Sequence, residues 1–276
     1  MTATPPAPIV TARLGSDPCP RVDVTVSPMP PDAAAVTVWR AWPGDRQLVR
    51  GAVRVPATGD TAVTDYEPPL GVPVVYTCQT VDAAGVSSAV SQPSAPVVLD
   101  VPDAWLQSPT EPGSAIALAL RRRPGAPTLK LGSLGPVTYA SDLSVVAVPG
   151  QPLPIALGTA RRQASAVPLA VHAGAFASDA LRDLLMGSLM LCLRVPAGRA
   201  RHLPPVAYVA LESVTEDYRP PPLDRSVWAI SATLVRGPGY GVLVPARTYD
   251  QLAGEAPDYA GLAARFATYL AAQRGS

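Results

Sequence analysis

The stretch from residue 206 to residue 235, VAYVALESVTEDYRPPPLDRSVWAISATLV, decides the fold class of this chain. Both of its ends alternate apolar and polar side chains with a period of two, which is the period of a β-strand. Tyr208 lies in the first alternating run and Trp228 in the second, and the polar, proline-rich residues 216–225 separate the two runs. We therefore predict an antiparallel pair of strands joined by a long loop, with Tyr208 and Trp228 packed in a core.

The first hundred residues repeat this alternation in shorter pieces, separated by breaks rich in Pro, Gly and Asp. In residues 36–42, for example, Val38 and Arg40 fall on one face and Trp39 falls on the other. Many short strands at such spacing predict a β-sandwich. The predicted strands are 21–27, 36–42, 48–55, 61–65, 74–82 and 86–92.

The chain changes character near residue 100, after a proline-rich boundary at residues 92–96. Short strands continue, and one helix is predicted among them, with Ser178 as its N-cap and Gly187 at its end. The leucines between these two residues form one face, which so short a helix must bury to be stable. The predicted strands are 115–121, 127–131, 138–148, 154–158, 164–172 and 189–195.

The C-terminal residues indicate a further helical segment. Tyr249, Tyr259 and Tyr269 recur at ten-residue spacing, and residues 258–272 carry an apolar stripe with helical periodicity. Such a stripe packs either on its own domain or on another subunit, and both interpretations stay open at this point.

Composition and charge argue against several classes of protein. The formal net charge is +1, and 48% of the residues are hydrophobic, which is enough for sizeable cores. No window of eighteen consecutive apolar residues occurs, so we expect no membrane span, and the proline-rich N-terminus lacks the pattern of a secretory signal. The only basic run, Arg121–Arg123, is interpreted as a solvated strand end, with a phosphate-binding role as the alternative. We expect no nucleic-acid-specific site.

The sequence predicts no catalytic, cofactor-binding or metal-binding residues. His172 and His202 are the only histidines, and neither has a second ligand at metal spacing. Glu212 and Glu216, with Asp217 beside them, are the carboxylates that could carry acid/base chemistry. On one strand face, Glu212 and Glu216 would be too far apart for a catalytic pair, so we interpret them as charges that protect a sheet edge.

Two further features have structural rather than chemical interpretations. Cys19, Cys78 and Cys192 are widely spaced and form no C-x-x-C motif, so we expect a protein that folds in a reducing cytoplasm. Cys78 and Cys192 each lie in an apolar strand-like run and are expected to be buried. The glycine-rich residues 237–241 include Pro238, which removes an amide that a phosphate cradle would need. These residues are predicted to be a flexible connection.

Residues 70–76, LGVPVVY, and 81–88, VDAAGVSS, resemble the second half of a fibronectin type III domain. In that family a leucine precedes a strand whose tyrosine forms the tyrosine corner, and Leu70 and Tyr76 occupy these places. A hairpin with glycine then leads into a serine-rich last strand. The resemblance implies a β-sandwich in this part of the chain, with Trp39 as its core tryptophan.

Residues 154–236 resemble the body domain of minor tail proteins of siphophages that infect high-GC Gram-positive bacteria. The shared order is a short helix with a Leu-Arg-x-Leu-Leu core, a buried strand, a Tyr-Val-Ala-Leu strand and, after a polar loop, a tryptophan-centred strand. These elements are residues 181–185, 189–193, 208–214 and 227–230. The layout is also similar to the distal tail protein fold, a β-barrel-like ring former. The chain departs from the family where residues 203–205, LPP, stand in place of a tryptophan, and the match is loose over residues 122–150.

Together these resemblances imply a mainly β protein with four parts. They are an N-terminal arm (1–7), a fibronectin type III-like β-sandwich (8–99), a distal-tail-like β-barrel domain with one short helix (100–245) and a C-terminal helical segment (246–276). The implied function is that of a structural virion protein of the phage tail tip, assembled in the cytoplasm of the bacterial host, and not that of an enzyme.

The implied partners are other copies of this chain, in a trimeric or hexameric ring, and the tail tube, tape-measure and receptor-binding proteins. No catalytic residue and no cofactor transfer from the tail family. The alternative is a carbohydrate-binding or adhesion module at a cell surface, which would need an exposed aromatic platform. A hydrolase with an unrecognised pair of carboxylates is the third interpretation.

Overall fold

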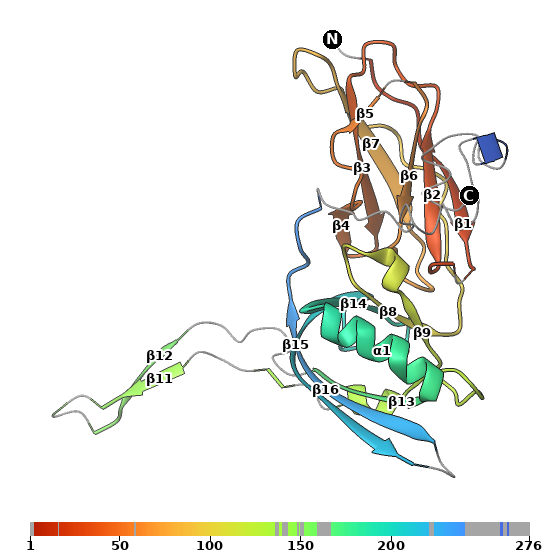
Figure 1. Ribbon diagram of the computed structural model, residues 1–276. Helices are drawn as coiled ribbons and strands as arrows, with labels where there is room; N and C mark the ends of the chain where they lie inside the picture. The colour runs from red at the N-terminus through yellow and green to blue at the C-terminus, as the bar shows by residue number, and fades with distance from the viewer. Residues whose placement is uncertain are drawn as a thin grey trace. The chain divides into compact units, whose positions relative to one another are not determined.

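The computed structural model divides the chain into two compact units (Figure 1). Unit 1 comprises residues 1–117, 192–206 and 237–276, and unit 2 comprises residues 118–191 and 207–236. The structure describes residues 3–15, 17–57, 59–135, 138–139, 143–147, 149, 152–158, 167–220, 224–240, 260–261 and 264. Over these residues the protein is mainly β, as predicted, with several sheets. None of the sheets in this part of the chain closes into the barrel that was expected.

Unit 1 begins with two antiparallel sheets that share one core. The first has the strand order β1-β2-β6, and in the second β3 pairs with β4, β5 and β7. The strands are β1 (Ile9–Arg13), β2 (Arg21–Val26), β3 (Ala35–Trp42), β4 (Asp45–Leu48), β5 (Val55–Pro56), β6 (Thr61–Asp65) and β7 (Val75–Val81). Val24 of β2 and Val38 of β3 are both fully buried in this core. Alternating burial confirms most of the predicted strands here, but residues 48–55 contribute only their two ends, to β4 and β5.

The inner face of β3 carries a charged residue rather than the expected tryptophan. Arg40 is fully buried there, whereas Trp39 is half-buried on the opposite face. The period of the strand explains the difference, because Trp39 lies between Val38 and Arg40 and cannot share their face. The core includes Leu70 and Tyr76, each with 0% exposure, and a different tryptophan, Trp105, which is 5% exposed.

Residues 86–92, predicted as a strand, run beside β7 in a different conformation. Ser88, Ser91 and Ser94 each donate a backbone amide to a β7 carbonyl and accept a β7 amide on the side-chain oxygen. Their partners on β7 are Thr80, Cys78 and Tyr76. We call Ser88, Ser91 and Ser94 the serine ladder. Each step of three residues along it corresponds to a step of two residues along β7. A regular β-ladder pairs residues one to one, so the predicted strand does not form as such.

The remainder of unit 1 comes from widely separated stretches of the sequence. β8 (Ala104–Gln107) pairs with β14 (Met190–Arg194), with Cys192 opposite Gln107. A 3-10 turn (Pro112–Ser114) and β9 (Ile116–Leu118) follow β8. All four residues of β8 are buried, so its two faces show no contrast, and alternation could not predict it as a strand.

Unit 2 contains an antiparallel set of strands, in the order β10-β13-β16-β15, with one α-helix packed on it. Its elements are β10 (Thr128–Leu129), a 3-10 turn (Leu131–Leu134), β11 (Leu143–Val146), β12 (Ile155–Gly158), β13 (Val167–Gly174), α1 (Ala175–Gly187), β15 (Val206–Arg219) and β16 (Arg225–Val235). α1 lies on the face of β13 and β16 that carries Val171 and Trp228 (Figure 1). β11 and β12 form a separate hairpin.

The antiparallel pair predicted around Tyr208 and Trp228 is confirmed and is longer than expected. β15 extends to Arg219 and β16 begins at Arg225, so part of the predicted loop 216–225 belongs to the strands. Tyr208 and Trp228 are 5% and 2% exposed, as predicted for core residues.

α1 begins earlier than predicted. Its N-cap is Gly174, which provides no side-chain hydrogen bond, and the three leucines of the helix are buried as predicted. Ser178, predicted to be the N-cap, lies inside the helix, is 3% exposed and accepts a hydrogen bond from Trp228 Nε1 at 2.8 Å. The prediction was wrong because a serine that caps a helix and a serine that bonds to a distant side chain have the same local sequence signature.

The predicted C-terminal helix lies almost wholly outside the described residues. Residues 260–261 and 264 are helical, and the series Tyr249, Tyr259 and Tyr269 lies outside the part of the chain that the structure describes. Within that part, no helix is long and apolar enough to cross a membrane.

Candidate functional site

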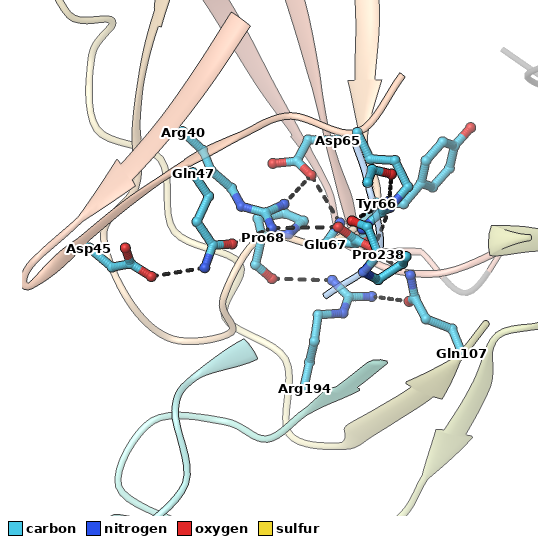
Figure 2. A network of polar contacts seen from close by, with 12 residues as sticks. Arg40, Asp45, Gln47, Asp65, Tyr66, Glu67, Pro68, Gln107, Arg194 and Pro238 are labelled. Carbon is cyan, nitrogen blue, oxygen red and sulfur yellow. Dashed lines mark hydrogen bonds and ion pairs between the residues drawn. The ribbon is translucent and has the colours of Figure 1, made fainter. Parts of the chain in front are cut away.

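Unit 1 encloses a network of buried ionic groups (Figure 2). Arg40 of β3 pairs with Asp65 at 2.6 Å and lies 3.5 Å from Glu67. Arg50 donates a hydrogen bond from Nε to Glu67 at 2.9 Å. These four residues are at most 3% exposed. Two carboxylates therefore face two guanidinium groups, and this balance is what allows ions to remain in a protein interior.

The network includes the hydroxyl of Tyr76, which donates to Asp65 at 3.0 Å. Burial, followed by the negative charge of Asp65, raises the pKa of Tyr76 well above its ordinary value. The phenol consequently stays a neutral hydrogen-bond donor. In a tyrosine corner the hydroxyl bonds to backbone, whereas here its partner is a carboxylate.

A second branch of buried contacts converges on Arg194 of β14 (Figure 2). Arg194 donates to the side chain of Gln107 at 3.0 Å and to the carbonyl of Pro20 at 2.9 Å. Gln107 in turn donates to the carbonyl of Tyr66 at 3.1 Å. These bonds join stretches of unit 1 that are far apart in the sequence. Because the side chains are closed to solvent, we interpret the network as architectural rather than catalytic.

The glycine-rich residues 237–241, predicted to be a flexible connection, are anchored over the part that the structure describes. The carbonyl of Gly239 accepts a hydrogen bond from Arg50 at 2.6 Å, and that of Tyr240 accepts one from the amide of Gly51 at 2.9 Å. Arg50 also lies 5.2 Å from the centre of the Tyr240 ring. The signal was missed because the anchor is a buried arginine that lies far away in the sequence.

The carboxylates of β15 lie on opposite faces of the sheet, contrary to the prediction that they share one. A β-bulge at Glu212 reverses the alternation of β15 before it reaches Glu216. Glu212 accepts a hydrogen bond from Ser231 at 3.2 Å, whereas Glu216 lies opposite Trp228. Since β16 alternates regularly between these two partners, they mark opposite faces, and Glu212 and Glu216 cannot act as a pair.

Glu216 fastens α1 to the sheet. Arg182 of α1 donates to both carboxylate oxygens at 2.9 Å, and Ser178 and Ser226 also donate to Glu216. Burial alone would raise the pKa of Glu216, but the hydrogen bonds from Ser226 and Arg182 outweigh burial and hold that pKa below its ordinary value. A carboxylate that stays ionised and is occupied by several donors suits a structural role better than that of a general acid. Its neighbour Asp217 contacts Arg219 at 3.3 Å.

The histidines and cysteines form no reactive centre among the described residues. His172 is half-buried on β13 and His202 is exposed in a turn. In the part of the chain that the structure describes, no group of three or more His, Cys, Asp or Glu side chains could hold a metal ion. Cys78 and Cys192 are free and buried, as predicted, and so is Cys19; burial raises the pKa of each thiol.

The hairpin of β11 and β12, which we call the apolar hairpin, exposes several large hydrophobic side chains. Its two strands are antiparallel and form a sheet of their own. Every residue in both strands is exposed. The exposed fractions are 58%, 61%, 50% and 59% for Leu143, Val145, Ile155 and Leu157.

Both faces of the apolar hairpin are hydrophobic. Directly opposed residues of an antiparallel pair share a face, so Val145 and Ala156 lie on one face and Val146 and Ile155 on the other. Residues 143–160 contain no charged side chain. A two-stranded hairpin is marginally stable on its own in water, and a contiguous exposed apolar surface is typical of an interaction site. The apolar hairpin is therefore the candidate functional site.

The sequence predicted strands at 138–148 and 154–158, which contain those of the apolar hairpin, but it did not predict their exposure. Strands that lie in solvent usually carry charged residues, which discourage unwanted pairing. The uncharged run from 143 to 160 made these strands look like buried ones. An apolar strand that packs inside its own chain and one that packs against another chain have the same local pattern.

A scan of the chain against protein-family models and a search of the curated proteins each found no match.

Proposed function

We propose that this chain is a non-catalytic structural protein of a bacteriophage tail tip, in which its copies form part of a ring or hub. The observation that carries this proposal is the apolar hairpin, whose two hydrophobic faces require a protein partner. The resemblance of residues 154–236 to minor tail proteins supplies the phage context, and β12 lies within that stretch. Tail tube, tape-measure and receptor-binding proteins are the other proposed partners.

A second copy of the chain is the partner that best fits a hairpin with two apolar faces. In a closed ring each subunit extends one surface to a neighbour and receives the matching surface of the next, so every copy is covered in the same way. The absence of charge from the apolar hairpin suits a permanent interface, since obligate interfaces are more hydrophobic than transient ones. Unit 2 also exposes Phe176 (95%) and Met186 (65%) of α1 and Leu189 (89%), which are available as receiving contacts.

We further propose that residues 8–99 form a fibronectin type III-like domain. Support comes from the two facing sheets, from Leu70 and Tyr76 in their shared core, and from the serine-rich segment beside β7. Such a module identifies a fold and no activity, so the assembly role rests on unit 2.

The test introduces charge into the apolar hairpin. The double variant Val145→Asp, Leu157→Asp places one carboxylate on each of its faces. Wild-type protein is expected to give the mass of a trimer or hexamer in native mass spectrometry, and a ring in negative-stain images. The double variant is expected to be a folded monomer, because both side chains are mostly exposed and have little intrachain packing to lose.

The matched control is Val90→Asp, which charges an exposed valine of unit 1 and should leave the ring intact. Equal loss of assembly in both variants would show that added charge, and not the apolar hairpin, is responsible. A wild-type protein that stays monomeric, binds glycans and is missing from purified virions would overturn the proposal in favour of an adhesion module.

A further inference from the structure

Unit 2 contains a pocket with a strongly basic wall, on the face of β13 that points away from α1. Its volume is about 660 Å³. The charged or titratable residues that line it are Arg122, Arg123, Lys130, His172, Asp224 and Arg225. The structural role proposed above uses none of these residues.

Strand pairing brings the wall of this basic pocket together from separate parts of unit 2. His172 of β13 lies opposite Thr128 of β10 on one side and opposite Val227 of β16 on the other. Lys130 directly follows β10, and Arg225 is the first residue of β16. The backbone of His172, Lys130 and Arg225 is therefore held in or directly beside the sheet, whereas Arg122 lines the pocket from an exposed segment outside the strands.

Asp224 is the one carboxylate among the residues that line the pocket. Asp224 is exposed and accepts a hydrogen bond from the hydroxyl of Tyr218 at 3.1 Å. Against this one carboxylate stand four Arg and Lys side chains, so the wall keeps an excess of positive charge. The whole chain carries a net charge of only +1, so the basic pocket is a local concentration of positive charge rather than a property of the entire surface.

The ionisation of His172 reflects this concentration of charge. Burial, followed by the positive charges of Arg225, Lys130, Arg219 and Arg122, lowers the pKa of His172. The imidazole is consequently neutral at pH 7 and has one N–H donor to offer a ligand. An anion that enters the pocket would offset the surrounding cations and raise the pKa of His172 again.

We propose that the basic pocket binds a phosphate group, with Arg122 and Arg225 as charged donors and His172 as a neutral donor. A guanidinium group presents two N–H donors at the spacing of two phosphate oxygens, and the ammonium of Lys130 adds a compact positive charge. A pocket of this volume admits a phosphate with a small organic body attached, and not a nucleic-acid duplex. The ligand class is therefore inorganic phosphate or the phosphomonoester of a small molecule.

The presence of only two histidines in the chain makes a direct test possible. The imidazole C2 protons of His172 and His202 are followed by NMR across pH in the full chain, with and without sodium sulfate, a tetrahedral dianion that does not titrate near neutral pH. Sulfate is expected to raise the pKa of His172 clearly more than that of exposed His202, which reports general screening. Equal shifts of the two histidines would overturn the proposal.

Binding measurements then separate the sources of phosphate. Inorganic phosphate and glycerol phosphate are compared by calorimetry, with acetate as a carboxylate control. A preference for glycerol phosphate of about tenfold or more would assign the pocket to a phosphomonoester, and equal affinity would assign it to free phosphate. Acetate that binds as tightly as either phosphate would overturn the assignment to phosphate.

Substitutions locate the site. Arg122→Gln and Arg225→Gln should each weaken phosphate binding by about tenfold or more, since each removes a charge-assisted hydrogen bond. Arg121→Gln is the matched control, because it removes a charge from the same basic run at a residue outside the pocket wall. Circular dichroism verifies that each variant is folded. Equal weakening by Arg121→Gln and Arg122→Gln would indicate a diffuse charge effect and contradict the proposed site.

Discussion

The two sheets of unit 1 and the apolar hairpin of unit 2 are built from similar strands that meet different surroundings. Val24 of β2 is fully buried, whereas Val145 of β11 is 61% exposed. The two sheets of unit 1 cover each other, and no second layer covers the apolar hairpin among the described residues. A strand rich in apolar side chains needs a second layer of protein to cover them. That layer does not have to belong to the same chain. For the apolar hairpin we infer that it belongs to another copy.

The largest expected effect concerns the interior of unit 1. Asp65→Asn should lower the free energy of unfolding by about 3–5 kcal/mol, because it leaves Arg40 without its closest ionic partner in a buried site. Urea unfolding followed by tryptophan fluorescence measures the change. Arg13→Gln, which breaks the exposed pair of Arg13 with Asp23, is the control and should cost less than about 1 kcal/mol. Similar losses in the two variants would mean that the network is not sealed from solvent.

The same substitution in both regions tests the comparison directly. Leu70→Ala removes a side chain with 0% exposure and should cost about 2–5 kcal/mol, the usual range for a cavity in a core. Leu157→Ala removes one that is 59% exposed, and below the concentration of assembly its cost should stay within about 0.5 kcal/mol. Chemical denaturation measures both variants. A comparable cost for Leu157→Ala in the monomer would show that the apolar hairpin packs within its own chain.

The smallest expected effect is a pH dependence in unit 2. The pKa of Glu216 is lowered in the folded protein, so its ionised form stabilises the fold above its unfolded pKa of about 4.3. That stabilisation is lost as the pH falls through the folded pKa. The unfolding temperature of wild type should therefore exceed that of Glu216→Gln at pH 7, and the difference should shrink as the pH falls below about 4. A difference that does not change with pH would exclude ionisation as its cause.

Local pattern predicted those elements in which one face is buried and the other is not. β2, β3 and β16 were predicted close to their observed bounds for this reason, whereas β15 continues four residues beyond its predicted end. β8 was missed because both of its faces are covered. The serine ladder was mistaken for a strand, because its spacing of three depends on the neighbouring β7 and not on its own residues alone.

The candidate site was harder to predict, because its features depend on contacts between distant residues. The role of Ser178 is set by Trp228, and the separation of Glu212 from Glu216 is set by a bulge that no residue type announces. Closure of a sheet into a barrel likewise depends on pairing between distant strands, which local periodicity does not record. The four-part division of the chain, the ring and its partners remain predictions that the experiments above address.

The serine ladder protects the edge of β7 from pairing with other molecules at high concentration. Its hydroxyl oxygens accept hydrogen bonds from the amides of Tyr76, Cys78 and Thr80, so these three amides are not available to strands of neighbouring molecules. Its own spacing of three offers an incoming strand no matching template. This edge of β7 is therefore protected from unwanted pairing, whereas the apolar hairpin has no such protection.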